Sequence, residues 1–293
     1  MKKNKDEIVF QVIDFIFLTM VILLIILPLM HIISVSVSSK EAVNTNSVGI
    51  FPKGFDLKAY GEILGKQVFL RSLVNTVGLT VITVLLALIV NTMAAYGFSR
   101  EFYGKKLITY VFVLTMYFSG GLVPTYILIK NWLRLDNNYL ALFLPSIVNV
   151  FHIIVIRSQI EAIPPSIRDA AVIDGASERQ ALFHVVIPSV SATIAAIGMF
   201  TALGMWNMWF PVLLYVSEKE LWTLQYFLRV IVFQKLMEFM PKENLMARPG
   251  VELVNPRNYQ MASIILVALP IVCIYPFVQK YFVKGIISGA VKG

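Results

Sequence analysis

Long apolar runs alternate with shorter polar segments along most of this chain. A helix needs about 20 mostly apolar residues to cross a bilayer, and the runs that reach this length predict six transmembrane helices. The predicted fold class is therefore an all-α membrane protein, with a transmembrane domain over residues 15–283. The six predicted spans are residues 15–37, 72–98, 107–129, 139–156, 190–215 and 259–282.

The first apolar run could be mistaken for a signal peptide, because Lys2, Lys3 and Lys5 precede it. It is longer than the apolar part of a signal peptide, and no clear small-residue cleavage site follows it. We therefore interpret it as a retained span. Residues 221–240 are apolar but interrupted by charged side chains such as Arg229, so they predict an interfacial or loop helix.

An even number of spans places both termini on the same side of the membrane. Lys and Arg divide almost equally between the two sets of loops, but the loops on the side of the termini are shorter and hold their positive charge at a higher density. This favours cytoplasmic termini, with residues 1–14 as the N-terminus and residues 284–293 as a C-terminal tail. The long loops at 38–71 and 216–258 are then expected outside the cell.

Composition supports a membrane protein and excludes some other classes. Hydrophobic residues make up 58% of the chain, charged residues 14%, and the mean hydropathy is +0.76, whereas soluble domains carry about 25% charged residues. The net charge of +8 suits membrane lipids with anionic head groups or an acidic partner. The basic residues are scattered over loops, so nucleic acid is not an expected partner. Cys273 is the single cysteine, which excludes an internal disulfide and a cysteine metal site.

The polar segment at residues 161–189 predicts two short helices joined at a glycine. Gly175 can adopt the left-handed conformation that ends a helix. Ser177 and Gln180 have the spacing of a capping box, which would start the second helix. Pro188 marks the passage into the next span. On composition alone, this segment is as well explained by an amphipathic surface hairpin that has no partner.

The spacing inside this segment resembles the EAA loop of ABC-importer permeases, in which Glu-Ala-Ala is followed after three residues by Gly and after nine more by Ile-x-Leu-Pro. Here Asp169, Ala170 and Ala171 are followed in the same register by Gly175 and by residues 185–188, with Asp in place of Glu. Three further stretches are similar to MalG-type carbohydrate permeases: residues 95–100, residues 118–126 and the terminal Gly289, Ala290, Val291, Lys292 and Gly293.

The resemblance implies a type I ABC-importer permease fold in a bacterial cell membrane, and a transport subunit that is not an enzyme. It implies that the EAA loop is a coupling helix seated in a groove of an ABC ATPase. By the same resemblance the C-terminal tail, residues 289–293, reaches into the ATPase pair. The residues that would dock the ATPase are Asp169, Ala170, Ala171, Gly175 and Pro188.

Several partners follow from the same resemblance. Two ABC ATPase subunits would hold the ATP and Mg, so no cofactor is expected on this chain, which contains no Gly-x-x-x-x-Gly-Lys-Ser/Thr phosphate loop. A homologous but non-identical second permease would complete a heterodimer. An extracytoplasmic solute-binding protein would deliver an oligosaccharide substrate and contact the outer loop 216–258, although a lid without a partner would also explain that loop.

Polar and aromatic side chains inside spans are costly unless they line a path or find a partner. Aromatic faces stack on sugar rings and amides bind hydroxyls, so such side chains are candidates for the substrate path. Each also has a simpler explanation, because Trp is common at membrane interfaces and Asn often bonds across helices. The candidates are Asn149, His152, Trp206, Asn207 and Trp209, with Asn75 and Asn91 in addition.

Two other classes of protein fit the sequence less well. An ion-coupled secondary transporter normally places carboxylates inside its spans, but apart from Asp14 near one end, the six predicted spans contain none. An intramembrane enzyme would need a nucleophile with a base or a metal cluster. The histidines show no His-Glu-x-x-His spacing. An ABC permease for a solute other than a sugar remains an alternative.

Overall fold

The computed structural model describes residues 5–164, 166–167, 173, 175–234 and 255–290. These ranges are helical, and they contain no β-strand beyond one isolated bridge between Ser38 and Phe55. The helices are α1 (Lys5–Ser36), α2 (Lys40–Asn44), α3 (Lys58–Leu64), α4 (Gln67–Ser99), α5 (Lys105–Tyr117), α6 (Leu122–Ile127), α7 (Tyr139–Ile147), α8 (Val150–Glu161), α10 (Glu178–Ala181), α11 (Ile187–Ser189), α12 (Ser191–Trp206), α13 (Phe210–Tyr215), α14 (Leu224–Arg229) and α16 (Pro256–Ala290), with short π-helices η1 (Leu128–Trp132), η2 (Leu182–Val186) and η4 (Val230–Gln234) and a 3-10 helix η3 (Lys219–Leu221).

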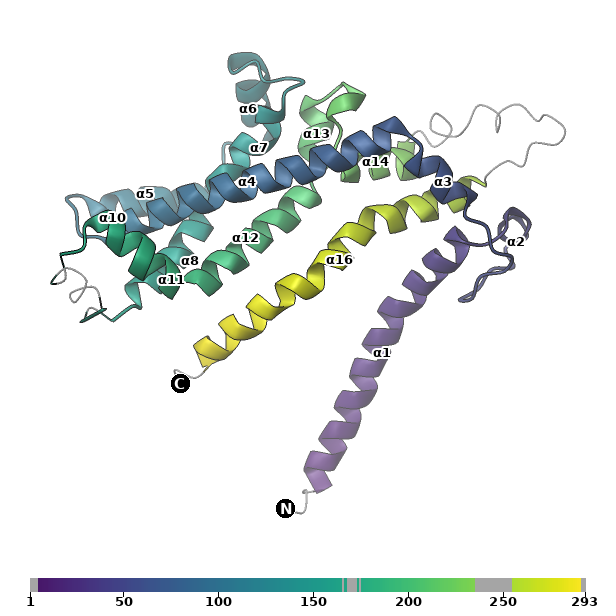
Figure 1. Cartoon of the computed structure of the whole chain (residues 1–293), viewed down its shortest axis with the longest axis horizontal. Coiled ribbons are helices and arrows are strands. Elements are labelled where there is room, and N and C mark those ends of the chain that lie inside the picture. Colours follow the sequence, from purple (N-terminus) through teal and green to yellow (C-terminus); the bar gives the residue numbers. More distant parts are fainter. Residues whose placement is uncertain (1–4, 165, 168–172, 174, 235–254, 291–293) are drawn as a thin grey trace. The chain divides into compact units, whose positions relative to one another are not determined.

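Four stretches of helix are long and apolar enough to cross a membrane, and two bent helix pairs raise the number of candidate spans in the described residues to as many as six. The four candidates outside the bent pairs are Val9–Ser36, Gln67–Ser99, Tyr139–Glu161 and Pro256–Ile274. Three of them lie in the long helices α1, α4 and α16 of Figure 1. The helical membrane architecture predicted from the sequence is therefore found, with some boundaries moved.

Besides the fourth predicted span, which breaks at Val148 and Asn149 between α7 and α8, two others are interrupted. The third consists of α5 and the pair α6–η1, which meet at an angle of 101°. Gly121 lies at this bend with φ 85°, a conformation that only glycine adopts readily. The fifth, residues 190–215, stops at Trp206 and restarts at Phe210, where Pro211 falls in the first turn of α13 and needs no helical N–H partner. Hydropathy does not register either interruption, because both sequences stay apolar.

Both predicted termini are largely helical. Helix α1 begins at Lys5, inside the predicted N-terminal segment 1–14, and α16 continues to Ala290, through most of the predicted tail 284–293. The described part of the predicted outer loop 216–258 holds η3, α14 and η4. Residues 235–254 lie outside the described residues.

The chain divides into two compact units, residues 1–69 with 228–270 and residues 70–227 with 271–293. In the first unit, the start of α16 is bound to the segment that follows α1. The Asn258 Nδ2 donates to the backbone oxygens of Val35 and Ser38, both at 2.8 Å. The Arg257 Nη1 donates to the Asn46 Oδ1 at 2.8 Å. These bonds join the end of α1 and residues 38–46 to the start of α16.

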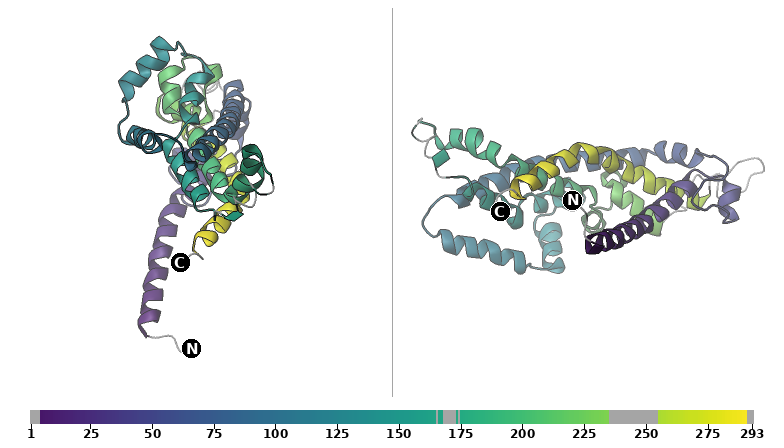
Figure 2. Two further views of the ribbon diagram at one scale, coloured as in Figure 1. Left: turned by 90° about the vertical axis from the view of Figure 1, so that its left-hand side faces the viewer. Right: turned by 90° about the horizontal axis from the view of Figure 1, so that it is seen from below.

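In the second unit, α8 lies against α5 and α12, and α13 lies against α7 (Figure 1; Figure 2 shows two further views). An apolar core joins one end of α4 to α8, η2 and α12. Close van der Waals packing of these aliphatic side chains holds the helix ends together. Its fully packed members are Ala95, Ile153, Ile156, Ile160, Ile163, Leu182, Val186, Val190 and Ile197.

Candidate functional site

The second half of loop 161–189 begins with a capped helix. The Ser177 hydroxyl accepts the Gln180 N–H at 3.4 Å, and the Gln180 Oε1 accepts the Ser177 N–H at 2.8 Å. This is the capping box that the sequence predicts, and both halves of it are present. It satisfies backbone N–H groups that the first turn of α10 leaves free. The start of the helix is thereby fixed at Glu178.

Gly175 has the left-handed backbone predicted for it, with φ 76°. A Cβ built on this residue would find no heavy atom of the described residues within 4 Å. The requirement for glycine within this chain therefore comes from the backbone conformation and not from close packing. The open space beside Gly175 lies in the loop expected to receive a partner.

Only some of the other predicted coupling residues lie among the residues that the structure describes. Pro188 lies in the first turn of α11, where a missing N–H is tolerated, and Gly289 and Ala290 are the last residues of α16. The remaining members of the two predicted sets lie outside the described residues: Asp169, Ala170 and Ala171 of the loop, and Val291, Lys292 and Gly293 of the tail.

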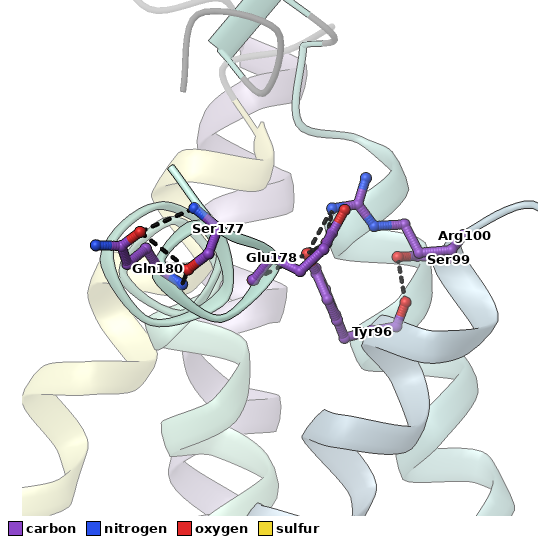
Figure 3. A network of polar contacts seen from close by, with 6 residues as sticks. All are labelled: Tyr96, Ser99, Arg100, Ser177, Glu178 and Gln180. Carbon is purple, nitrogen blue, oxygen red and sulfur yellow. Dashed lines mark hydrogen bonds and ion pairs between the residues drawn. The ribbon is translucent and has the colours of Figure 1, made fainter. Parts of the chain in front are cut away.

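A polar cluster of Tyr96, Arg100 and Glu178 connects this loop to α4. The three side chains point toward one another (Figure 3), with the Tyr96 hydroxyl and the Arg100 guanidinium both donating to the Glu178 Oε2. The Arg100 Nη2 lies 2.6 Å from that oxygen, and the guanidinium stands 4.8 Å from the centroid of the Tyr96 ring. Sequence reasoning missed this cluster, because Arg100 and Glu178 are distant in the chain and each resembles an ordinary surface charge.

A second polar cluster lies where α8 leads into the loop. The Arg157 Nε donates to the Glu161 Oε1 at 2.9 Å within α8, and the Lys105 Nζ of α5 lies 3.7 Å from the same oxygen. Lys105 also pairs with Glu101 at 2.9 Å, and this hydrogen bond, with the positive charge of Lys105, lowers the pKa of Glu101. Loop 161–189 is thus joined to neighbouring helices by charged groups at its first residue, Glu161, and at Glu178 in its second half.

A cavity of about 540 Å³ opens between two helix breaks of the second unit. One break, at Val148 and Asn149, separates α7 from α8. The other, at residues 207–209, separates α12 from α13. Non-helical backbone at membrane depth is found only where protein buries it or where it lines a water-filled space. The two breaks therefore mark this cavity as a place built for polar contents.

The cavity brings together four of the five substrate-path candidates. Asn149 and His152 line one side, and Asn207 and Trp209 line the other. The Asn149 Oδ1 is partly used, because it accepts the His152 N–H at 3.1 Å and caps α8. The His152 Nδ1 is buried and has no hydrogen-bond partner among the described residues.

The wall of the cavity is neutral. None of the described residues that line it is Asp, Glu, Lys or Arg. Its lining includes the aromatic rings of Phe200, Trp209 and Phe210 and the side-chain amides of Asn149 and Asn207. Such a wall can stack against a ring and bond hydroxyl groups, but it offers no fixed charge.

Three other candidates lie away from the cavity. Trp206 is 6% exposed and lines a separate apolar cavity of about 450 Å³. Asn75 bonds the carbonyl oxygens of Glu220 and Trp222, and accepts from the Tyr139 hydroxyl at 2.7 Å. Asn91 is fully buried behind the first helix break, where it bonds the backbone on both sides of Val148. The two asparagines therefore have structural partners.

Comparison with known proteins connects this architecture to a family. No family model matches the chain. It is 33% identical to the polygalacturonan/rhamnogalacturonan transport system permease protein YtcP of Bacillus subtilis, over 94% of this chain and 96% of that protein. It is 34% identical to protein LplC of the same organism, over 100% of this chain and 98% of that protein.

A solved structure agrees with the sequence relatives. A chain of a bacterial ABC transporter involved in the import of the acidic polysaccharide alginate matches with a TM-score of 0.88 and 28% sequence identity. The match covers 96% of this chain and 99% of the other. The agreement over nearly the whole length confirms the resemblance drawn from the loop and the C-terminal tail. The chain belongs to the family of carbohydrate ABC importer permeases, and it is a membrane transport subunit of that family.

Proposed function

We propose that this chain is one of two non-identical membrane subunits of a bacterial importer for oligosaccharides. In this proposal both termini are cytoplasmic, and a pair of ABC ATPase subunits binds loop 161–189 and supplies the energy of ATP hydrolysis. A solute-binding protein outside the membrane delivers the substrate. The chain itself binds and moves the sugar and carries out no covalent chemistry.

The cavity between the two helix breaks is the observation that carries this proposal. An oligosaccharide presents apolar ring faces and many hydroxyl groups, and the cavity wall pairs an indole at Trp209 with the amide of Asn207. A volume of about 540 Å³ lies in the range of small-molecule sites. The neutral wall also suits passage, because tight charge pairing would slow release.

Loop 161–189 has the form that a docking element needs. The capping box at Ser177 and the left-handed Gly175 define its backbone, and the space beside Gly175 is open. Nucleotide-dependent closure of the ATPases would favour one arrangement of the loop over another, which shifts the population of the permease toward the matching state. The loop supports the proposed coupling role through this shape.

The names of the relatives favour a substrate class. YtcP is named for polygalacturonan and rhamnogalacturonan transport, and the solved structure belongs to an importer of the acidic polysaccharide alginate. We therefore propose oligosaccharides of acidic polysaccharides as the substrate. The wall contributed by this chain offers ring stacking and hydrogen bonds, so any counter-charge for the acid groups would come from the second permease.

Uptake into proteoliposomes that contain the complete importer tests the proposal. Labelled oligogalacturonides should enter only when ATP is on the ATPase side and the binding protein is on the opposite side. Neutral malto-oligosaccharides of equal length are the matched comparison, and faster uptake of these would overturn the acidic class. Uptake driven by an ion gradient without ATPase subunits would overturn the proposed function itself.

A further inference from the structure

Helix α4 has polar contacts at two levels, and each level serves a different part of the second unit. At its end, Tyr96 and Arg100 hold Glu178, the first residue of α10. Further back along the same helix, Asn91 bonds the backbone at the break that borders the cavity. Asn91 and Tyr96 are five residues apart, which corresponds to about 7.5 Å of rise along a helix.

We propose that Tyr96, Arg100 and Glu178 form a polar link that makes α4 the connection between loop 161–189 and the cavity. This inference rests on the coupling role proposed for the loop. When the loop is displaced, the link requires α4 to follow, and Asn91 then carries the displacement to the backbone at Asn149. The three residues are positioning residues, because they lie away from the cavity.

The stability of the fold does not require this link. The side chains of Arg100 and Glu178 are 35% and 72% exposed, and ion pairs between exposed side chains contribute about 0–1 kcal/mol. The apolar core that includes Ala95, Ile160 and Val186 holds the same helix ends together independently. These charged groups therefore contribute little to stability, and their main effect is to set the position of α10 relative to α4.

The link has the geometry to transmit displacement in more than one direction. Glu178 receives two donors that approach from α4, and the guanidinium also rests on the Tyr96 ring (Figure 3). The capping box holds Glu178 at a fixed place in the first turn of α10. A single surface ion pair could slide, whereas this arrangement fixes both the distance and the side of approach.

The test measures oligosaccharide transported per ATP hydrolysed by the complete importer in proteoliposomes. Glu178→Gln and Arg100→Gln are each expected to lower this ratio by about two- to fivefold, with ATP hydrolysis and subunit assembly retained. The charge exchange Arg100→Glu with Glu178→Arg should recover most of the ratio. Glu101→Gln, which removes a neighbouring exposed ion pair that does not touch α10, is the control and should keep the wild-type ratio.

A reporter in the cavity separates this link from a merely structural role. With Cys273 replaced by serine, Ser146→Cys places a single thiol in the cavity wall. Its rate of labelling should change when ATP is added to the importer with an intact link, and should no longer change with Glu178→Gln. An ATP response that persists in Glu178→Gln, or an equal loss in Glu101→Gln, overturns the inference. A wild-type importer that hydrolyses no ATP during uptake overturns the proposed function, and the inference falls with it.

Discussion

The Oδ1 of Asn91 accepts a hydrogen bond from the backbone N–H of Asn149 at 2.9 Å. The Nδ2 of the same side chain donates to the carbonyl oxygen of Ile147 at 2.8 Å. One buried amide of α4 thus bonds one backbone group on each side of Val148, at the break between α7 and α8. The cavity depends on this bridge, because the break forms part of its wall.

Asn91→Leu should destabilise the permease. The leucine keeps a similar size but leaves the partly buried N–H of Asn149 and carbonyl of Ile147 without their partner, at a total cost of about 1–3 kcal/mol. Thermal unfolding of the detergent-solubilised complex measures this loss. Thr83→Val is the matched control. Thr83 is buried in the same helix, but its hydroxyl donates to the Leu79 carbonyl oxygen within α4 and makes no bond to another helix among the described residues. Equal unfolding temperatures for the two variants would contradict the bridging role.

Ser177→Ala should loosen the start of α10. Loss of a helix cap costs about 1 kcal/mol, which corresponds to about fivefold faster amide exchange if the first turn opens locally. Hydrogen–deuterium exchange of peptides that cover residues 177–186 measures the effect. Ser177→Asp keeps an acceptor at the cap and should exchange like the wild type. Unchanged exchange in the alanine variant would show that other contacts hold this turn.

Trp209→Ala should weaken substrate passage. Removing a ring that stacks on the sugar is expected to cost about 1 kcal/mol, equivalent to about a fivefold higher KM for uptake, with a smaller effect on the maximal rate. Uptake by the reconstituted importer over a range of substrate concentrations gives both values. Trp132→Ala serves as the control, because Trp132 is 78% exposed and does not line the cavity. A similar KM in both variants would remove Trp209 from the substrate path.

Gly175 should tolerate Asn better than Val. Its φ of 76° is accessible to asparagine, whereas a β-branched side chain there costs about 1–2 kcal/mol. Among the described residues, no atom would clash with the Cβ of either side chain. Co-purification of the ATPase subunits with the permease should fall in the valine variant and remain near normal in the asparagine variant. If neither variant changes co-purification, the conformation of Gly175 has no part in ATPase binding.

The sequence predicted the local features of loop 161–189 better than its connections. The Ser177–Gln180 capping box and the left-handed Gly175 are confirmed, because each depends on residues a few positions apart. The contact between Arg100 and Glu178 was not predicted. It joins two distant segments, and the charge pattern of either one is also that of a solvated loop.

The spans were predicted where apolar length alone decides, as in α1 and α4. They were misjudged where a span is interrupted, as at residues 207–209, because hydropathy measures transfer to an apolar phase and not the continuity of backbone hydrogen bonds. Asn91 illustrates the same limit. Its polarity made it a candidate for the substrate path. Its partners, the Ile147 carbonyl and the Asn149 N–H, can be identified only in the folded structure, which brings them next to α4.

The bridge at Asn91 also has a consequence for how the chain is assembled. Because synthesis proceeds from the N-terminus, α4 is made before α7 and α8. The Asn91 Nδ2 already has a partner in its own helix, the Ala87 carbonyl at 2.6 Å, but its oxygen has none there until Asn149 arrives. A shift of one residue between α4 and the later helices α7 and α8 would leave that oxygen unpaired in an apolar interior. One amide, inserted early, therefore selects the register of the helices that follow it.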